Sequence, residues 1–345
     1  MKLLVTTQAV DINHPILGFM IGWITEFSKH FDEVHVICLQ KGMYNLPSNV
    51  FVYSLGKESG ENKLKYTLRF YRHFAHIFFR VHVDYVFFHM GAIYNILAAP
   101  FFLIRKIYGT KFYWWKAHGH INTIGKLALL FVDRVYTSTE SGFSIDTKKR
   151  HVIGQAIDTT LFLSSINKPE RKKEIIFVGR VMPIKHIEDF IDTALILLEQ
   201  NPELRFSIIG PNGDGTYYKR QRAKVLALGL ENAVSFVDSK TQSELVPVYQ
   251  NAFVFLNTSL THSMDKTVLE AGLCGCVPVT GNKAFVGLLN DDGLYVETPT
   301  PQNYAEVIQK LLTQEDTSGL QMKLQSEIIR QHSLNTFPQR IFNFQ

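Results

Sequence analysis

The sequence predicts an α/β protein of two domains, each built on a parallel β-sheet covered by helices, with the two sheets facing a central cleft. Short apolar runs of strand length alternate with amphipathic stretches of helix length, which is typical of βαβ units. The alternation begins at Lys2 and restarts at Glu174 after a polar stretch. The chain has 345 residues, more than one ordinary core supports, so two domains are expected.

The composition is that of a globular protein. Hydrophobic residues make up 46% of the chain and charged residues 19%. The longest apolar run, 94–104, ends at Arg105, well short of the roughly 20 residues that a membrane span requires. No signal-peptide core follows Met1, so a cytoplasmic location is expected. The three cysteines are too few for a disulfide framework or a zinc cluster.

Eleven strands are predicted from short runs rich in β-branched and aromatic residues. Six belong to the first domain, at 2–6, 34–38, 50–53, 84–88, 111–115 and 134–137. Five belong to the second, at 174–178, 204–209, 234–237, 252–256 and 277–280. Since the carboxyl ends of parallel strands lie at one edge of a sheet, the loops that follow them are the expected ligand-binding segments.

The domain boundary is predicted near residue 160. The polar, proline-containing stretch 164–173 is the best linker, so the domains are expected at 1–160 and 161–325. A helix at about 325–345 is expected to pack back on the first domain. Residues 1–155 hold 18 Lys and Arg against 10 Asp and Glu, which indicates an anionic partner there: a membrane surface, a lipid phosphate or an acidic glycan.

The strongest functional signal is a polar loop that leads into a helix. Residues 261–272 read Thr-His-Ser-Met-Asp-Lys-Thr-Val-Leu-Glu-Ala-Gly and follow a predicted strand. Asp265 or Ser263 is the expected N-cap, and the N–H groups of the helix end suit a diphosphate. Glu270, about one turn further on, could accept two ribose hydroxyls. A capped helix with a half-buried Glu270 fits the same spacing equally well.

A second signal follows the first strand of the second domain. Gly179 permits a tight exit from the strand, and Arg180 and Lys185 follow on one loop. These two cations could hold a diphosphate from one side. A pair of solvated surface charges is the alternative.

The two motifs resemble the donor half of the GT-B fold glycosyltransferases of family four, the retaining group with an E-x7-E motif. Gly154-Gln155-Ala156-Ile157-Asp158-Thr159 with Phe162 resembles the family's crossing into its second domain. The resemblance covers nearly the whole chain and is tightest over 150–285. It implies two Rossmann-like domains and transfer of a hexose from a nucleotide diphosphate sugar, with a UDP-sugar favoured. The implied acceptor is a glycan or lipid-linked glycan in cell-surface polysaccharide biosynthesis.

The resemblance also implies roles for the matching residues. Arg180 and Lys185 would neutralise the diphosphate, and Glu270 would hold the ribose. His118, in Lys116-Ala117-His118-Gly119-His120, resembles the family's histidine that lies against the donor sugar, although a lone histidine after a strand is more often structural. The implied donor-binding set is Gly18, Gly179, Gly210, Val237, His262, Ser263, Asp265, Lys266, Thr267, Val268 and Glu270; the acceptor-side candidates are Asp11, Asn13, His14 and His120.

Three positions depart from the family pattern. His262 stands where the first glutamate of E-x7-E falls, which bears on the donor sugar and on activity itself. His186 replaces the glycine that usually follows the lysine. The loop 10–18 lacks the family's paired glycines, and Gly18 takes part of their place. A non-catalytic nucleotide-sugar or glycan-binding relative is therefore an alternative.

Other chemistries have weaker signals. No Asp-x-Asp motif ends a strand, so no metal is expected. The turn Gly210-Pro211-Asn212-Gly213-Asp214-Gly215, with Asp238 further on, suggests a nicotinamide-dependent oxidoreductase, but its glycine order is wrong. A nucleotide-sugar epimerase would usually require carboxylate acid/base residues in the cleft, and none are obvious in the sequence. The basic half lacks a nucleic-acid-binding module, so no nucleic-acid partner is expected.

The segment 62–80 is the best candidate for contact with the acceptor or with the inner face of a membrane. Basic residues recur at helical spacing, and a second face is apolar, with Leu64, Leu68, Tyr71, Phe74, Ala75 and Phe78. A helix that packs this apolar stripe on the sheet is an equally good interpretation.

Overall fold

The computed structural model describes residues 1–163, 173–342 and 344, and the chain forms two compact units. Unit 1 comprises Met1–Ala156 and Leu334–Gln345, and unit 2 comprises Ile157–Ser333. The division thus falls a few residues before the predicted boundary at 160. The predicted linker 164–173 lies, apart from Lys173, outside the described residues.

Unit 1 contains a seven-stranded parallel sheet of order β3-β2-β1-β4-β5-β6-β7. Its strands are β1 (Lys2–Val10), β2 (Glu33–Lys41), β3 (Val50–Ser54), β4 (Tyr85–His89), β5 (Lys111–Trp115), β6 (Arg134–Thr137) and β7 (Arg150–Val152). All six predicted strands are present. The prediction missed β7, because a three-residue edge strand that includes Arg150 and His151 has no apolar alternation.

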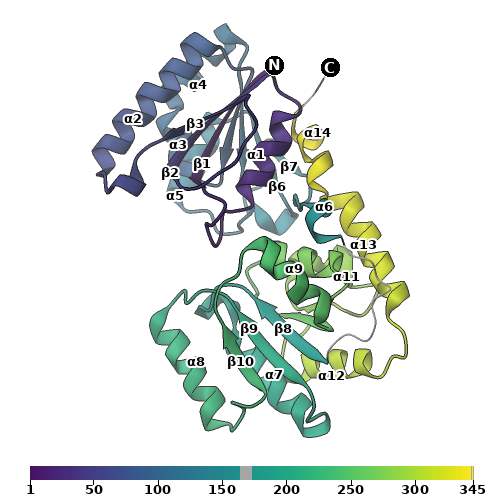
Figure 1. Ribbon diagram of the computed structural model, residues 1–345. Coiled ribbons are helices and arrows are strands. Elements are labelled where there is room, and N and C mark those ends of the chain that lie inside the picture. The colour runs from purple at the N-terminus through teal and green to yellow at the C-terminus, as the bar shows by residue number, and fades with distance from the viewer. Residues whose placement is uncertain (164–172, 343, 345) are drawn as a thin grey trace. The chain divides into compact units, whose positions relative to one another are not determined.

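Helices cover both faces of this sheet (Figure 1). Neighbouring strand residues point to opposite faces, so Leu3 packs in one core and Leu4 in the other. The first core receives α1 (Met20–Ser28) and α14 (Phe337–Ile341). The second receives α2 (Lys63–His76), its π-helical continuation η2 (Ile77–Val81), α3 (Ala92–Leu97), α4 (Ala99–Tyr108), α5 (Thr123–Ala128) and η3 (Leu129–Phe131).

Unit 2 contains a five-stranded parallel sheet of order β10-β9-β8-β11-β12. Its strands are β8 (Glu174–Val178), β9 (Arg205–Ile209), β10 (Val234–Val237), β11 (Val254–Asn257) and β12 (Val277–Thr280), so all five predicted strands are present within two residues at their ends. Its helices include α6 (Thr159–Phe162), α7 (Ile187–Gln200), α8 (Gly215–Ala227), α9 (Gln242–Asn251), α10 (Lys266–Leu273), α11 (Val286–Leu289), α12 (Pro301–Leu312) and α13 (Ser318–His332).

The end of the chain differs from the predicted helix at 325–345. Residues up to His332 belong to α13, which stays with unit 2 because Leu324 and Ile328 are buried in its core. The Gln325 side chain donates to the Leu273 carbonyl at 2.7 Å. Only from Leu334 does the chain join unit 1, where Phe337 lies against Trp23 with ring centroids 4.4 Å apart. Among the described residues, no helix is both long and apolar enough to cross a bilayer.

Candidate functional site

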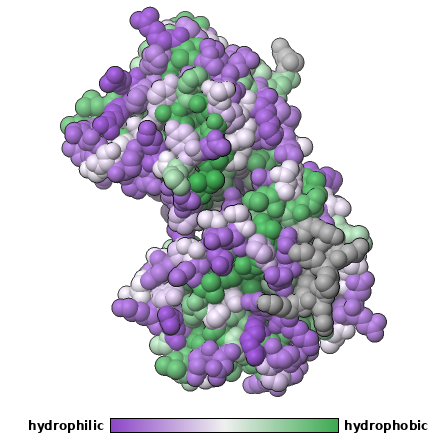
Figure 2. Space-filling view, in the orientation of Figure 1, coloured by the Kyte–Doolittle hydropathy of each residue, from purple (hydrophilic) through white to green (hydrophobic). Residues whose placement is uncertain are grey.

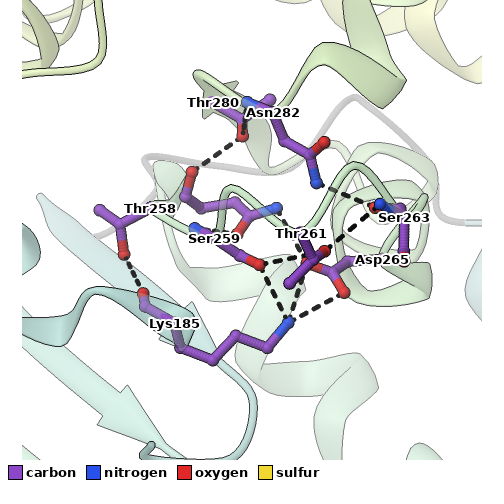
Figure 3. A network of polar contacts seen from close by, with 9 residues as sticks. Lys185, Thr258, Ser259, Thr261, Ser263, Asp265, Thr280 and Asn282 are labelled. Atoms are coloured by element: carbon purple, nitrogen blue, oxygen red, sulfur yellow. Dashed lines mark hydrogen bonds and ion pairs between the residues drawn. The ribbon is translucent and has the colours of Figure 1, made fainter. Parts of the chain in front are cut away.

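The loops that follow β8 and β11 meet in unit 2 at the start of α10. These strands are neighbours in the parallel sheet, so their carboxyl ends place both loops at one edge. The Lys185 Nζ lies 2.9 and 3.0 Å from the two carboxylate oxygens of Asp265, and 3.3 Å from the Ser259 Oγ (Figure 3). The two sequence motifs therefore contact each other directly.

This ion pair is largely removed from water. The Lys185 side chain is 14% exposed and that of Asp265 is 20% exposed. Asn257 adds a longer hydrogen bond, from its Nδ2 to an Asp265 oxygen at 3.4 Å. A charge-assisted pair with this little exposure is held much more firmly than a surface pair.

Asp265 occupies the N-cap position of α10, but its carboxylate makes no capping bond. Asp265 is thus one of the two predicted N-cap residues, but it makes no capping bond because its carboxylate is turned toward Lys185. The Ser263 Oγ is buried and has no hydrogen-bond partner within the described ranges. Neither the Asp265 carboxylate nor the Ser263 hydroxyl therefore accepts from the N–H groups at the start of α10, which is the positive end of the helix dipole.

Hydroxyl and amide side chains brace the loop, and most of them were not predicted. The Thr258 hydroxyl donates to the Lys185 carbonyl at 2.8 Å, which ties the two loops together. The Asn282 amide donates to the Ser263 carbonyl at 2.9 Å, and the Thr280 hydroxyl to the Asn257 carbonyl at 2.8 Å (Figure 3). Their positions directly after β11 and β12 were the available signal, since that edge of the sheet is where ligands bind.

Gly179 and Gly210 allow two strand exits to lie very close together. A Cβ on Gly210 would stand 2.1 Å from the Gly179 carbonyl oxygen, and Gly210 has φ +146°, so no other residue fits there. The Gly210 N–H donates to the Val237 carbonyl at 3.0 Å. These three predicted residues therefore lie together at the carboxyl edge formed by β8, β9 and β10.

Arg180 lies on the same loop as Lys185 but outside its network. Its side chain is exposed, and no ion pair or hydrogen bond joins it to another side chain in the parts of the chain that the structure describes. Thr267 is half-buried and Val268 buried in the first turn of α10. The structure thus brings together Lys185, Asp265 and the helix end, with Arg180 available at the loop surface.

Glu270 is more deeply buried than the half-buried side chain that the sequence suggested. It is 4% exposed, and its two oxygens accept from the Gln242 amide at 3.2 Å and the Tyr249 hydroxyl at 3.3 Å. Burial raises the pKa of Glu270, and the Lys266 ammonium opposes that rise. Lost hydration likewise lowers the pKa of Lys266. Each carboxylate oxygen has a second lone pair with which to accept a further hydroxyl.

The two histidines that depart from the family pattern share an unusual backbone conformation. His262 has φ +56° and His186 has φ +48°, both in the left-handed region that favours glycine. His186 begins α7 in this conformation, so it adopts the geometry that a glycine would provide. His262 is exposed on the loop before α10.

The acceptor-side candidates belong to unit 1 and fix the shape of one loop. Asp11 accepts from the Asn13 N–H at 3.0 Å, and the His14 Nδ1 accepts from the Leu17 N–H at 3.0 Å. Burial lowers the pKa of His14, which favours the neutral ring that can accept these bonds. A Cβ on Gly18 would lie 3.0 Å from the Ile12 carbonyl oxygen, so a glycine lets the loop close.

His118 and His120 follow β5 in the same unit. The His118 Nδ1 accepts from the His120 N–H at 3.4 Å, which orients the His118 ring. His118 is half-buried and His120 exposed. Both therefore lie at the carboxyl edge of the unit 1 sheet, as the strand assignment predicts.

The glycine-rich turn after β9 serves as a helix start. Asp214 accepts from the N–H groups of Thr216 at 3.1 Å and Tyr217 at 2.9 Å, and so caps α8. Asp214 is thereby used structurally, at the N-terminus of α8.

Residues 158–331 match the family model described as glycosyl transferases group 1, and the chain belongs to this family. The match covers nearly all of unit 2, including the Lys185–Asp265 pair and α10.

Curated relatives are similar over part of their length. A D-inositol 3-phosphate glycosyltransferase of Corynebacterium glutamicum is 27% identical over 155 residues, which are 43% of this chain and 37% of the relative. One component of the phosphatidylinositol N-acetylglucosaminyltransferase of Arabidopsis thaliana is 24% identical over 203 residues, 56% of this chain and 45% of the relative. The chain thus aligns with less than half of each relative.

Solved structures share the whole fold. Anabaena Alr3699/HepE in complex with UDP and glucose superposes with a TM-score of 0.74, at 17% identity, over 99% of this chain and 98% of that one. Sucrose-phosphate synthase from Thermosynechococcus elongatus gives a TM-score of 0.74, at 13% identity, over 96% and 95% of the two chains. The two parallel-sheet units are therefore those of the GT-B fold.

Proposed function

We propose that this protein is a retaining, metal-independent hexosyltransferase that uses a UDP-sugar. The proposed acceptor is a glycan or lipid-linked glycan of cell-surface polysaccharide biosynthesis, and the proposed location is the cytoplasm. Similar structures hold UDP with glucose and UDP-glucose, which supports the choice of donor. The names of the inositol-phosphate and phosphatidylinositol relatives support an acceptor that carries phosphate or lipid.

The observation that carries this proposal is the position of Lys185 beside the start of α10, inside the segment that the family model matches. Charge builds up on the leaving diphosphate as the sugar becomes oxocarbenium-like. Fixed positive groups aimed at that charge lower the barrier. Lys185, Arg180 and the N–H groups of α10 would supply this stabilisation without a metal ion.

The remaining residues would position the substrates. Glu270, held by Gln242 and Tyr249, would accept the ribose hydroxyls. His262 and Ser263 would face the sugar, since they stand at the position of the family's first glutamate and next to it. His118 would lie against the donor sugar, and the loop that Asp11, Asn13 and His14 shape would face the acceptor together with His120.

Donor hydrolysis and transfer by the purified protein test this proposal. A panel of UDP-sugars is incubated with the protein in the presence of EDTA, and the anomeric configuration of the product is read by NMR. Turnover with retained configuration supports retention, metal independence and the UDP-sugar donor. Loss of turnover in EDTA that Mg²⁺ restores overturns metal independence, and an inverted product overturns retention.

The second candidate function is a non-catalytic nucleotide-sugar-binding relative, which His262 favours because it replaces a family glutamate. In that case UDP-sugars bind to the protein but are neither hydrolysed nor transferred. His262→Glu is the informative variant, because gain of turnover from an inactive wild-type protein identifies this residue as the cause.

A further inference from the structure

The helices on one face of the unit 1 sheet expose many aliphatic side chains. On α4, Leu103 is 74% exposed and Ile107, one turn later, is 80% exposed. The neighbouring elements α2, α5 and η3 add further ones, so that the outer helix layer exposes Leu64, Leu68, Leu103, Ile107, Leu127 and Leu130. We use "outer helix layer" for α2, α4, α5 and η3.

The fold of unit 1 does not need these side chains. Phe70 and Phe74 from α2, with Phe101 from α4, already fill the space above the sheet, and the rings of Phe74 and Phe101 lie 4.6 Å apart. The predicted apolar stripe of segment 62–80 therefore divides, because Phe74 and Phe78 are buried while Leu64 and Leu68 are exposed. The exposed side chains point away from the core. Their contact with water is unfavourable, and a bound partner that covers them would remove this free-energy cost.

The same layer is strongly basic. Residues 61–133 contain ten Lys and Arg and three acidic residues. Two of the three are mostly buried in ion pairs, Glu61 with Lys65 and Arg69, and Asp133 with Arg105. Asp84 accepts from the Lys2 N–H and lies just before β4, not on the layer. The exposed cations of the outer helix layer and of η2 are Lys63, Lys65, Arg72, Arg80, Lys106 and Lys126.

On α2, α4 and α5, exposed aliphatic residues have basic neighbours in the sequence. Leu64 lies between Lys63 and Lys65, Ile107 follows Lys106, and Leu127 follows Lys126. Figure 1 shows α2 and α4 next to each other on this side of the sheet. Figure 2 shows hydrophobic residues among hydrophilic ones at the edge of the molecule where Figure 1 draws α2.

We propose that the outer helix layer docks on an anionic lipid surface. Aliphatic side chains that protrude from helices lying in a plane enter the region between headgroups and acyl chains. The adjacent long Lys and Arg side chains reach back to the lipid phosphates. No exposed acidic side chain of the layer opposes that attraction, and this charge complementarity favours lipid over an uncharged apolar partner.

Vesicle flotation tests the proposal with the full-length protein. It binds vesicles of phosphatidylcholine with phosphatidylglycerol and binds vesicles of phosphatidylcholine alone much more weakly; raised salt weakens the binding. The double variant Leu103→Glu, Ile107→Glu lowers the partition coefficient at least about tenfold, because it removes the most exposed aliphatic groups and adds negative charge. Leu226→Glu, at a 67% exposed leucine on α8 of unit 2, leaves binding unchanged.

The charge is tested separately. Arg72→Glu with Lys106→Glu abolishes the preference for phosphatidylglycerol, whereas Lys310→Glu, at an exposed lysine of unit 2, preserves it. Melting temperatures and UDP binding of all variants stay near those of the wild type, since the changed side chains are exposed and far from the donor residues in sequence. Absence of wild-type binding to both kinds of vesicle, or equal losses in the control variants, overturns the proposal. If the wild type binds neither kind of vesicle, an acidic protein partner is the remaining interpretation of this surface.

Discussion

Lys185 faces the carboxylate of Asp265, and under the proposed function this contact determines the charge that a diphosphate would meet. Asp265 holds the ammonium from 2.9 Å with both of its oxygens near. A bound diphosphate must therefore share Lys185 with Asp265 or take its place. Asp265 keeps the lysine extended toward the start of α10, and its carboxylate would also compete with the diphosphate for the positive charge.

Removing either cation of the β8 loop should lower turnover strongly. Arg180→Ala and Lys185→Ala are each expected to reduce kcat by at least about 100-fold, because both cations stabilise charge that develops in the transition state. The measurement is kcat with the best UDP-sugar, alongside the melting temperature. Lys219→Ala, at an exposed lysine of α8, is the matched control. Near-normal turnover in both variants would remove these residues from the mechanism.

Asp265→Asn should lower the unfolding free energy of the protein without ligand and strengthen UDP binding. The variant leaves the mostly buried Lys185 ammonium without its countercharge, which costs about 2 kcal/mol of unfolding free energy. UDP then meets no competing carboxylate, so its dissociation constant falls about tenfold. Calorimetric titration and urea unfolding measure the two effects.

The control for this prediction is Asp291→Asn, which removes one exposed negative charge elsewhere in unit 2. It should change neither quantity. Weaker UDP binding by Asp265→Asn would show that Asp265 acts only by positioning Lys185.

The candidate site residues of unit 2 could be selected from the sequence, but their contacts could not. Lys185 and Asp265 were both selected from their motifs, but 80 positions separate them and spacing along the chain contains no information about such a pair. Ser259, Thr258 and Asn282 were missed because short polar residues after strands are common in every α/β protein. The depth of Glu270 also came from tertiary packing against α9, which its position on α10 does not reveal.

At the level of elements, the edge formed by β2, β3 and α2 contains a buried histidine. His35 is 3% exposed, and its two ring nitrogens lie 3.0 Å from Glu33 and 3.1 Å from the Tyr53 hydroxyl. Burial lowers the pKa of His35 from 6.5; the Glu33 carboxylate opposes this, while Lys2 and His76 add to it. The ring is therefore neutral in the folded protein over a range where the unfolded chain is already protonated.

Stability should fall as pH drops below the unfolded value of about 6.5 for this histidine. The sign follows because the unfolded state takes up the proton first, so acid favours unfolding until the lower folded pKa is reached. Urea unfolding at about pH 7.5 and about pH 5.5 should give a smaller difference for His35→Gln than for the wild type, by up to about 1 kcal/mol. His120→Gln, at an exposed histidine of unit 1, is the control and should keep the wild-type difference. An unchanged difference in His35→Gln would assign the acid sensitivity to other groups.

The elements themselves were largely predictable. Eleven of the twelve strands followed from apolar runs of the right length, since a parallel sheet buried on both faces needs nearly continuous hydrophobic strands. The short edge strand β7 lacked that pattern. Helix α2 was correctly placed, but its exposed and buried sides were not, because only the position of α4 determines which apolar residues are covered.

For the whole molecule, the two-domain α/β class followed from the chain length and the restart of the strand pattern. The chain's return to unit 1 was expected near residue 325, whereas the structure places it at Leu334, because the amphipathic pattern of α13 continues past the point where packing changes partner. Each unit has its own core, so a ligand held by unit 2 alone should stabilise that unit.

Amide hydrogen exchange with and without nucleoside diphosphates tests whether the loops after β8 and β11 and the start of α10 bind the donor's diphosphate. With saturating UDP, exchange should slow in residues 179–187 and 257–270 and stay unchanged in the outer helix layer of unit 1. GDP and ADP serve as comparisons for the base. If no nucleoside diphosphate slows exchange in these two segments, or if protection is confined to other parts of the chain, the donor site lies elsewhere and the roles given to Lys185, Asp265 and Glu270 are contradicted.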